Sequence, residues 1–499
     1  MKRLKYIWTV TLAVLLCACG NDWLDIEPST SIDTEGSLTT LRDYEFTLNG
    51  IYSTMQSYYY YGARMQYYGD VTGDDIQAYS ASKRCATYYQ FGWNKDNVPT
   101  TFWRTCYDII QNTNIVINGI DAIQYDGEDE KGQQAFDAYQ KDLKGQALAV
   151  WALATFDLTR LYGYPYLKDN GTSLGAAIVR EVVGITYKPS RSTVAKCYEE
   201  IIKSLKNAVP LLATQKEKAK SSWLAQSVQG KMNKWSAMTL LSRAYLYMGD
   251  YGNALKVAEE AIEGAEKDGY RLWTNEEYAM AWSEAFSSEV LFEIVNLLTD
   301  SPGKESIGYL CSPDGYKDMI LTGSFYDFMM QDKDDVRFKM IDIVSKRAYY
   351  TNKYPGENGD GGPADANIRL FRLSELYLIA AEAAVQEKDN TKAVKYLEAI
   401  VKRGNPANSV SGTVTVEQVL DERRKEFYGE GHRFFDVLRT GGTIKRENVS
   451  VKEISSTKHL SLQDYAKEFD WNMYKVVLPI PKAEIDANPN MKGQQNPGY

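Results

Sequence analysis

Histidine is nearly absent from this chain of 499 residues, which contains only His432 and His459. Histidine is the commonest general acid or base near neutral pH and a frequent zinc ligand. Neither histidine lies in a metal-binding pattern such as H-E-x-x-H. This scarcity argues against histidine-based metal chemistry.

Cysteine is also sparse, and no C-x-x-C pair with metal-ligand spacing occurs. Two of the six cysteines lie close to the N-terminus, and spacing alone does not decide whether the other four are free or paired. The six are Cys17, Cys19, Cys85, Cys106, Cys197 and Cys311. We therefore predict that the protein has no metal site and needs no cofactor.

Excess positive charge is missing as well, because the formal net charge is −9. A nucleic-acid-binding surface needs a basic stripe that displaces counterions from phosphates, and none is present. The sequence therefore argues against a nucleic-acid partner, and we expect none.

Enzyme motifs are weak. Gly171 to Gly175 matches the nucleophile-elbow pattern but lacks its strand-to-helix context. Asp332, Asp334 and Asp335 resemble half of a calcium loop, but Arg337 stands where the turn glycine belongs. Glycosidases need only two carboxylates, so that class stays open. We predict a binding protein and not an enzyme.

The first residues form a leader, in which Lys2, Arg3 and Lys5 precede an apolar run from Tyr6 to Leu16. That run is too short to span a bilayer. Small residues before Cys19 match a bacterial lipoprotein cleavage box, which makes Cys19 the predicted acylated residue. The alternative is a plain signal peptide in which Cys19 is unmodified.

Helical hairpins dominate the rest of the chain. Between Arg372 and Asn405, apolar residues recur at i, i+3, i+4 and i+7 on two successive faces. Lys234 to Gly264 has the spacing of a tetratricopeptide repeat, including the turn Gly249-Asp250. A third pair is split between Gly145–Leu161 and Ser192–Val209. We predict an all-α, mainly helical fold in which tetratricopeptide-like hairpins display long loops.

Tyrosine is abundant, with 37 residues in the chain, ten of them between Tyr52 and Tyr89. Helical periodicity is lost there, so we expect irregular structure. Tyrosine and tryptophan present apolar faces on which sugar rings stack, while asparagine binds the hydroxyl groups. The setting of Trp93, in a glycine-containing turn, favours an exposed stacking face over a core position. The candidate ligand residues are Trp93, Asn94, Asn97, Tyr309, Tyr316 and Tyr354.

Several blocks together resemble the SusD/RagB family of outer-membrane lipoproteins. Trp103, Tyr107 and Asn114 fit the same family, as does NDWLD after the lipoprotein box. The blocks are GQALAVWALATFDLTRLYGYP, RLSELYLIAAEA, ERRKEFYGEGHRFFDVLR and VLPIPKAEIDANPNMKGQQNPGY.

This resemblance implies helical repeats packed against an irregular, loop-rich half that bears the ligand. It also implies a lipid-anchored protein on the outer face of the outer membrane, acting as a lid on a SusC-like TonB-dependent transporter. Family members bind glycans or, in the RagB branch, peptides. We expect an oligosaccharide ligand, with a peptide ligand and a purely structural lid as alternatives.

These expectations divide the chain into six parts. They are a signal peptide at 1–18, an anchor and tether at 19–37, an N-terminal region at 38–140, helical repeats at 141–270, a loop-rich ligand region at 271–368, and a C-terminal helical region and tail at 369–499.

Overall fold

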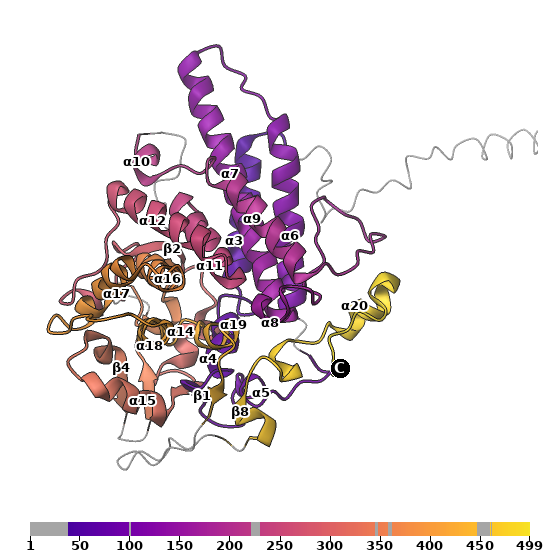
Figure 1. The fold of residues 1–499 in the computed structure, drawn as a ribbon. Helices are drawn as coiled ribbons and strands as arrows, with labels where there is room; N and C mark the ends of the chain where they lie inside the picture. The colour runs from indigo at the N-terminus through magenta and orange to yellow at the C-terminus, as the bar shows by residue number, and fades with distance from the viewer. Residues whose placement is uncertain are drawn as a thin grey trace, which may run out of the picture.

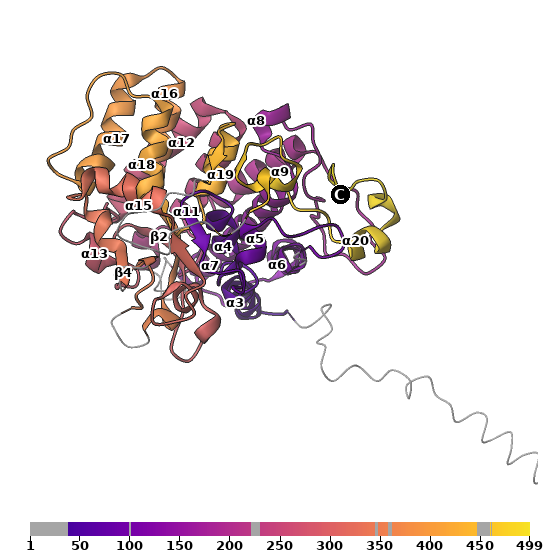
Figure 2. The same ribbon diagram turned by 90° about the horizontal axis from the view of Figure 1, so that it is seen from below.

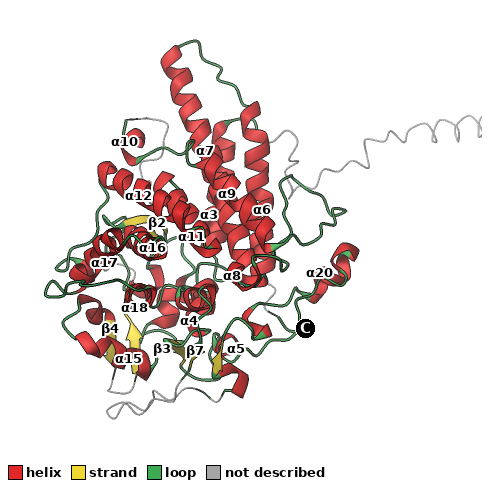
Figure 3. Cartoon of the chain, viewed as in Figure 1, coloured by secondary structure: helices red, strands yellow, loops and turns green. Residues whose placement is uncertain are grey.

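The computed structural model describes residues 38–98, 101–220, 230–344, 348–357, 362–446, 460 and 462–499. Cys19 and His459 lie outside the described residues. The fold is mainly helical, with a few short strands, as predicted (Figure 3).

Helices account for most of the described chain, and the longest are α7 with 33 residues, α6 with 19 and α12 with 18. The α-helices are α3 (Leu41–Gln56), α4 (Arg64–Val71), α5 (Ala86–Tyr89), α6 (Thr101–Gly119), α7 (Glu130–Tyr162), α8 (Tyr166–Asp169), α9 (Val194–Ala208), α10 (Gln215–Lys218), α11 (Lys234–Met248), α12 (Tyr251–Asp268), α13 (Tyr278–Ala281), α14 (Ile307–Cys311), α15 (Gly323–Met329), α16 (Leu373–Gln386), α17 (Asn390–Gly404), α18 (Val416–Phe427), α19 (Arg433–Arg439) and α20 (Lys482–Ala487).

The strands form two-stranded antiparallel sheets, pairing β1 with β3, β2 with β6, β4 with β5 and β7 with β8. The strands are β1 (Ile76–Ala78), β2 (Val290–Ile294), β3 (Met319–Leu321), β4 (Ile341–Val344), β5 (Ala348–Thr351), β6 (Ile368–Arg372), β7 (Ile444–Lys445) and β8 (Glu468–Phe469).

The three predicted hairpins are present and follow one another in space. Helix α7 packs on α9, α9 on α11, α11 on α12, α12 on α16, and α16 on α17. Figure 1 shows α6 and α7 rising above the rest of the chain, and Figure 2 shows α16 to α18 at the opposite end from α20. Each hairpin thus buries its apolar face against the next one, as repeat proteins do.

The turn between α11 and α12 shows why its residues suit a hairpin. Gly249 has a φ of +76°, a left-handed conformation that glycine adopts without strain. A Cβ at Gly249 would also lie 2.9 Å from Leu167. The Asp250 side chain accepts a hydrogen bond from the Asn253 backbone and caps α12.

Small residues let α12 approach its neighbours closely. Ala254 is fully buried, and its carbonyl accepts a hydrogen bond of 2.8 Å from the Ser242 hydroxyl on α11. We expect Ala254→Leu to lower the free energy of unfolding by about 1–3 kcal/mol, because a larger side chain overpacks this contact. Thermal unfolding, with the exposed Lys256→Leu on the same helix as control, measures the effect; equal melting temperatures would contradict this packing.

The tyrosine-rich stretch is more regular than the sequence suggested. It contains α4, in which every residue from Met65 to Val71 is buried. A helix buried on all sides shows no amphipathic period, which explains the wrong expectation of irregular structure. A Cβ at Gly69 would lie 2.0 Å from the Gly431 carbonyl oxygen, so glycine permits the backbone of α4 to pass beside that loop.

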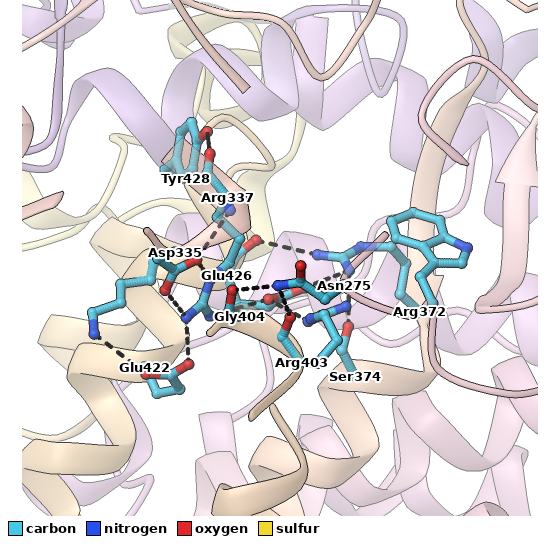
Figure 4. A network of polar contacts seen from close by, with 12 residues as sticks. Asn275, Asp335, Arg337, Arg372, Ser374, Arg403, Gly404, Glu422, Glu426 and Tyr428 are labelled. Atoms are coloured by element: carbon cyan, nitrogen blue, oxygen red, sulfur yellow. Dashed lines mark hydrogen bonds and ion pairs between the residues drawn. The ribbon is translucent and has the colours of Figure 1, made fainter. Parts of the chain in front are cut away.

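Buried ion pairs join α17, α18 and β6. Figure 4 shows Glu426 of α18 beside Arg337, Arg372 and Arg403. Its carboxylate accepts hydrogen bonds at 2.7 Å from Arg372, 2.5 Å from Arg403 and 3.3 Å from Arg337. Burial alone would raise the pKa of Glu426, but the guanidinium groups of Arg403, Arg372 and Arg337 hold that pKa far below its usual range.

Candidate functional site

Trp93 does not present a stacking face. Its side chain is 1% exposed, and its indole N–H donates a hydrogen bond of 3.0 Å to the Tyr499 hydroxyl. The Lys475 ammonium donates to the carbonyls of Phe91 and Trp93 and holds the turn against the C-terminal tail. The expectation of an exposed Trp93 is therefore wrong, because a segment about four hundred residues away covers the ring.

Asn94 and Asn97 remain exposed, but they mainly bond to their own turn. The Asn97 side chain accepts a hydrogen bond of 2.6 Å from the Asn94 backbone, and the Asn94 side chain accepts one of 2.8 Å from the Asp96 backbone. These contacts form an Asx-type turn. The turn adjoins the buried Trp93.

Tyr354 is also inaccessible. Its ring is buried, and its hydroxyl donates a hydrogen bond of 2.7 Å to the Gly429 carbonyl. A Cβ at Gly308 of α14 would lie 3.1 Å from the Tyr354 Cβ, so the buried Tyr354 packs directly against this helix. The expectation that Tyr354 offers its ring to a ligand is corrected: Tyr354 supports α14.

Tyr309 and Tyr316 come together at the surface. Their ring centroids are 5.2 Å apart, and the rings meet edge to face at 86°. The Tyr316 backbone donates a hydrogen bond of 3.0 Å to the Tyr309 carbonyl, which closes the turn after α14. A Cβ at Gly315 would lie 1.9 Å from that carbonyl oxygen, so only glycine fits there. Tyr316 is 37% exposed.

The pairing of β1 with β3 brings a second segment to these tyrosines. Because Ala78 pairs with Met319, the residues after β1 lie beside the turn that carries Tyr316. The Arg84 guanidinium lies 4.4 Å from the Tyr316 ring centroid. Tyr79 is exposed at the edge, and its backbone donates a hydrogen bond of 2.9 Å to the Asp318 carbonyl.

The buried Asp318 carboxylate holds Arg84 in place beneath the Tyr316 ring. This carboxylate accepts a hydrogen bond of 2.9 Å from the Tyr67 hydroxyl and lies 3.4 Å from Arg84. Burial raises the pKa of Asp318. Burial also opposes the charge of Arg84, yet Asp318 and then Glu305, at 3.2 Å, raise the pKa of that guanidinium. Arg84 is thus oriented between two carboxylates with one face on Tyr316.

A third segment extends the same surface. The Ile307 backbone at the start of α14 donates a hydrogen bond of 2.8 Å to the Gly62 carbonyl, next to the run of tyrosines. The Arg64 guanidinium lies 5.0 Å from the ring centroids of both Tyr58 and Tyr59. Tyr59 is 49% exposed.

We call this region the tyrosine–arginine surface. Sequence reasoning selected two of its members, and the density of tyrosines in the N-terminal stretch pointed to three others only as a group. The arginines gave no signal, because their role depends on contacts between distant segments. The surface consists of Tyr58, Tyr59, Arg64, Tyr79, Arg84, Tyr309 and Tyr316.

Potential metal ligands are not clustered in the part of the chain that the structure describes, and its histidine and cysteines are buried. Within the described ranges, no group of three or more His, Cys, Asp or Glu side chains could hold a metal ion. His432 is buried and stacks on Phe427 at 4.6 Å, and burial lowers its pKa. Cys85, Cys106, Cys197 and Cys311 are buried free thiols. No helix among the described residues is long and apolar enough to cross a membrane.

Comparison with family models gives matches over two parts of the chain. Residues 324–499 match the model described as the SusD family. Residues 22–246 match the model described as starch-binding and associating with the outer membrane. The two matches cover the N-terminal helices and the C-terminal region.

Solved structures of similar proteins show the same fold over nearly their whole length. A putative sugar binding protein from Bacteroides vulgatus is 55% identical, with a TM-score of 0.86, covering 93% of this chain and 99% of the other. A SusD superfamily protein from the same organism is 38% identical, with a TM-score of 0.81, covering 93% of this chain and 100% of the other.

A sequence comparison adds a partial match to a further protein. The starch-binding protein SusD of Bacteroides thetaiotaomicron is 33% identical over 153 residues, or 30% of this chain and 25% of that protein.

Proposed function

The chain belongs to the SusD family, and on this basis we propose that it binds an oligosaccharide on the tyrosine–arginine surface. The observation that carries the proposal is the grouping of exposed tyrosine rings and oriented guanidinium groups from three distant segments. The sugar-binding description of the 55% identical relative supports it.

The chemistry of the surface suits a sugar. Pyranose rings have apolar C–H faces that pack on aromatic rings, and their hydroxyl groups bind charged donors and acceptors. Tyr59 and Tyr316 supply exposed rings, while Arg84 and Glu305 supply the polar groups. A fixed guanidinium loses little conformational entropy when it binds.

We further propose that the protein passes its ligand to a SusC-like TonB-dependent transporter and acts as its lid. The family model associated with the outer membrane supports that location. The division into helical repeats at 141–270 and a ligand region at 271–368, which contains Tyr309 and Tyr316, belongs to the same proposal.

A binding screen of the soluble 20–499 chain tests the proposed ligand class. Glycan arrays and peptide libraries, followed by calorimetry, should give saturable binding to a glycan. Binding to peptides alone would identify the ligand as a peptide and not a glycan. No binding to either set would favour a purely structural lid.

Anchoring through Cys19 makes a separate prediction. Several acyl chains on one residue anchor a protein stably, so Cys19→Ala should move the protein from the membrane fraction to the soluble fraction. Cys17→Ala is the matched control and should leave the protein in the membrane. Unchanged detergent partitioning of the Cys19 variant would refute the lipoprotein assignment.

A further inference from the structure

The tyrosine–arginine surface is rich in positive charge, although the chain as a whole carries −9. Its three segments, residues 58–64, 79–84 and 304–318, contain five cationic and three acidic side chains. The local charge is therefore opposite in sign to that of the protein. Local positive charge adds no binding energy for a neutral sugar, whereas it attracts an anionic sugar.

A cation lies over each of the five tyrosine rings of the surface. Their distances to the ring centroids are 5.0 Å for Arg64 over Tyr58 and over Tyr59, 5.7 Å for Lys83 over Tyr79, 4.4 Å for Arg84 over Tyr316, and 5.8 Å for Lys304 over Tyr309. Such contacts hold a charged group beside a stacking face. A ligand that packs on one of these rings thus comes close to a cation.

The acidic side chains are unequal in their access to a ligand. Asp318 is fully buried and already binds Tyr67 and Arg84. Asp314 is exposed in the turn before Tyr316. The Glu305 side chain is 47% exposed and holds Arg84 at 3.2 Å. An exposed ion pair of this kind contributes little, so a carboxylate or sulfate from a ligand can take the place of Glu305.

We propose that the glycan bound here is acidic, and that its carboxylate or sulfate groups bind Arg84 and the neighbouring cations while its rings pack on Tyr316 and Tyr59. This inference rests on the proposed glycan-binding function and specifies its substrate class. Arginine recognises both kinds of anionic group through paired N–H donors.

Matched sugars that share a backbone and differ in whether it carries anionic groups test the proposal. Oligogalacturonates and their methyl esters share one backbone, and sulfated and unsulfated dextran oligosaccharides form the second pair. We expect the acidic member of one pair to bind at least about tenfold more tightly at about 50 mM salt, and this advantage to shrink at about 300 mM as the charges are screened. The two pairs distinguish a carboxylated from a sulfated ligand.

Charge variants assign the preference to this surface. Lys304→Gln and Arg84→Gln should reduce the preference for the acidic sugar, whereas Glu305→Gln should increase it by removing the competing carboxylate. Arg104→Gln is the control, since this arginine side chain is 85% exposed on α6, outside the surface. Lys304 bears no contact to Asp318 among the described residues, so its variant remains informative if Arg84→Gln unfolds the site.

The outcomes separate this inference from the proposed function. Equal, salt-independent binding of acidic and neutral sugars would overturn the acidic substrate class and leave glycan binding intact. Failure of both acidic sugars to bind would likewise overturn it, and a neutral glycan found by the array would then still support the proposed function.

Discussion

Replacing Glu426 by alanine should lower the free energy of unfolding by about 3–5 kcal/mol, because it leaves buried guanidinium groups without their shared partner. Arg337, Arg372 and Arg403 all contact this carboxylate. Among the residues that the structure describes, Arg403 then keeps one ion-pair partner, Glu289, at 3.0 Å. The ion pairs tie α17 to α18 and β6, so we expect the loss to affect cooperative unfolding of the C-terminal region.

Chemical denaturation of Glu426→Ala against the wild type measures this effect. The control is Glu263→Ala, which removes an exposed helix ion pair with Lys267 and should change stability by less than about 0.5 kcal/mol. Similar denaturation midpoints for Glu426→Ala and the control would show that the buried network contributes little.

Trp93→Ala should also destabilise the protein, by about 3–5 kcal/mol, because it removes a large buried ring and leaves a cavity. The ring centroid lies 5.2 Å from that of Phe91 and 6.2 Å from that of Tyr68. The substitution also leaves the Tyr499 hydroxyl without its indole donor. The expected result is a large drop in melting temperature.

Thermal unfolding of Trp93→Ala, with the exposed neighbour Lys95→Ala as control, checks this expectation. The same variant should keep its glycan affinity at temperatures where it is folded. A stable Trp93 variant with weakened glycan binding would restore Trp93 as a ligand residue and contradict its burial.

Local periodicity was enough to predict the helical hairpins. Ala254 in α12 and Ala380 in α16 each belong to a series of small and apolar residues at helical spacing, and both are fully buried. The turn at Gly249 was likewise visible, because its signal lies within a few adjacent residues. Helices and turns whose signals lie within a few adjacent residues could therefore be predicted from the sequence alone.

The candidate site depends on distant contacts and was only partly accessible. Tyr309 and Tyr316 were identified from their loop, but Arg84 reaches Tyr316 only through the pairing of β1 with β3, two strands of three residues each. Strands this short leave no alternating pattern to recognise. The prediction for Trp93 was wrong because its burial also depends on a distant contact: its indole N–H donates to the hydroxyl of Tyr499, 406 residues away.

The affinity of a Tyr309→Ala, Tyr316→Ala double variant for the glycan found by the screen tests the central claim most directly. Removing aromatic anchors typically costs about 2 kcal/mol or more, so we expect affinity to fall at least about thirtyfold with little change in melting temperature. Tyr187→Ala, at an exposed tyrosine outside the surface, should bind as the wild type does. Unchanged affinity in a folded double variant would contradict the assignment of the tyrosine–arginine surface as the glycan site.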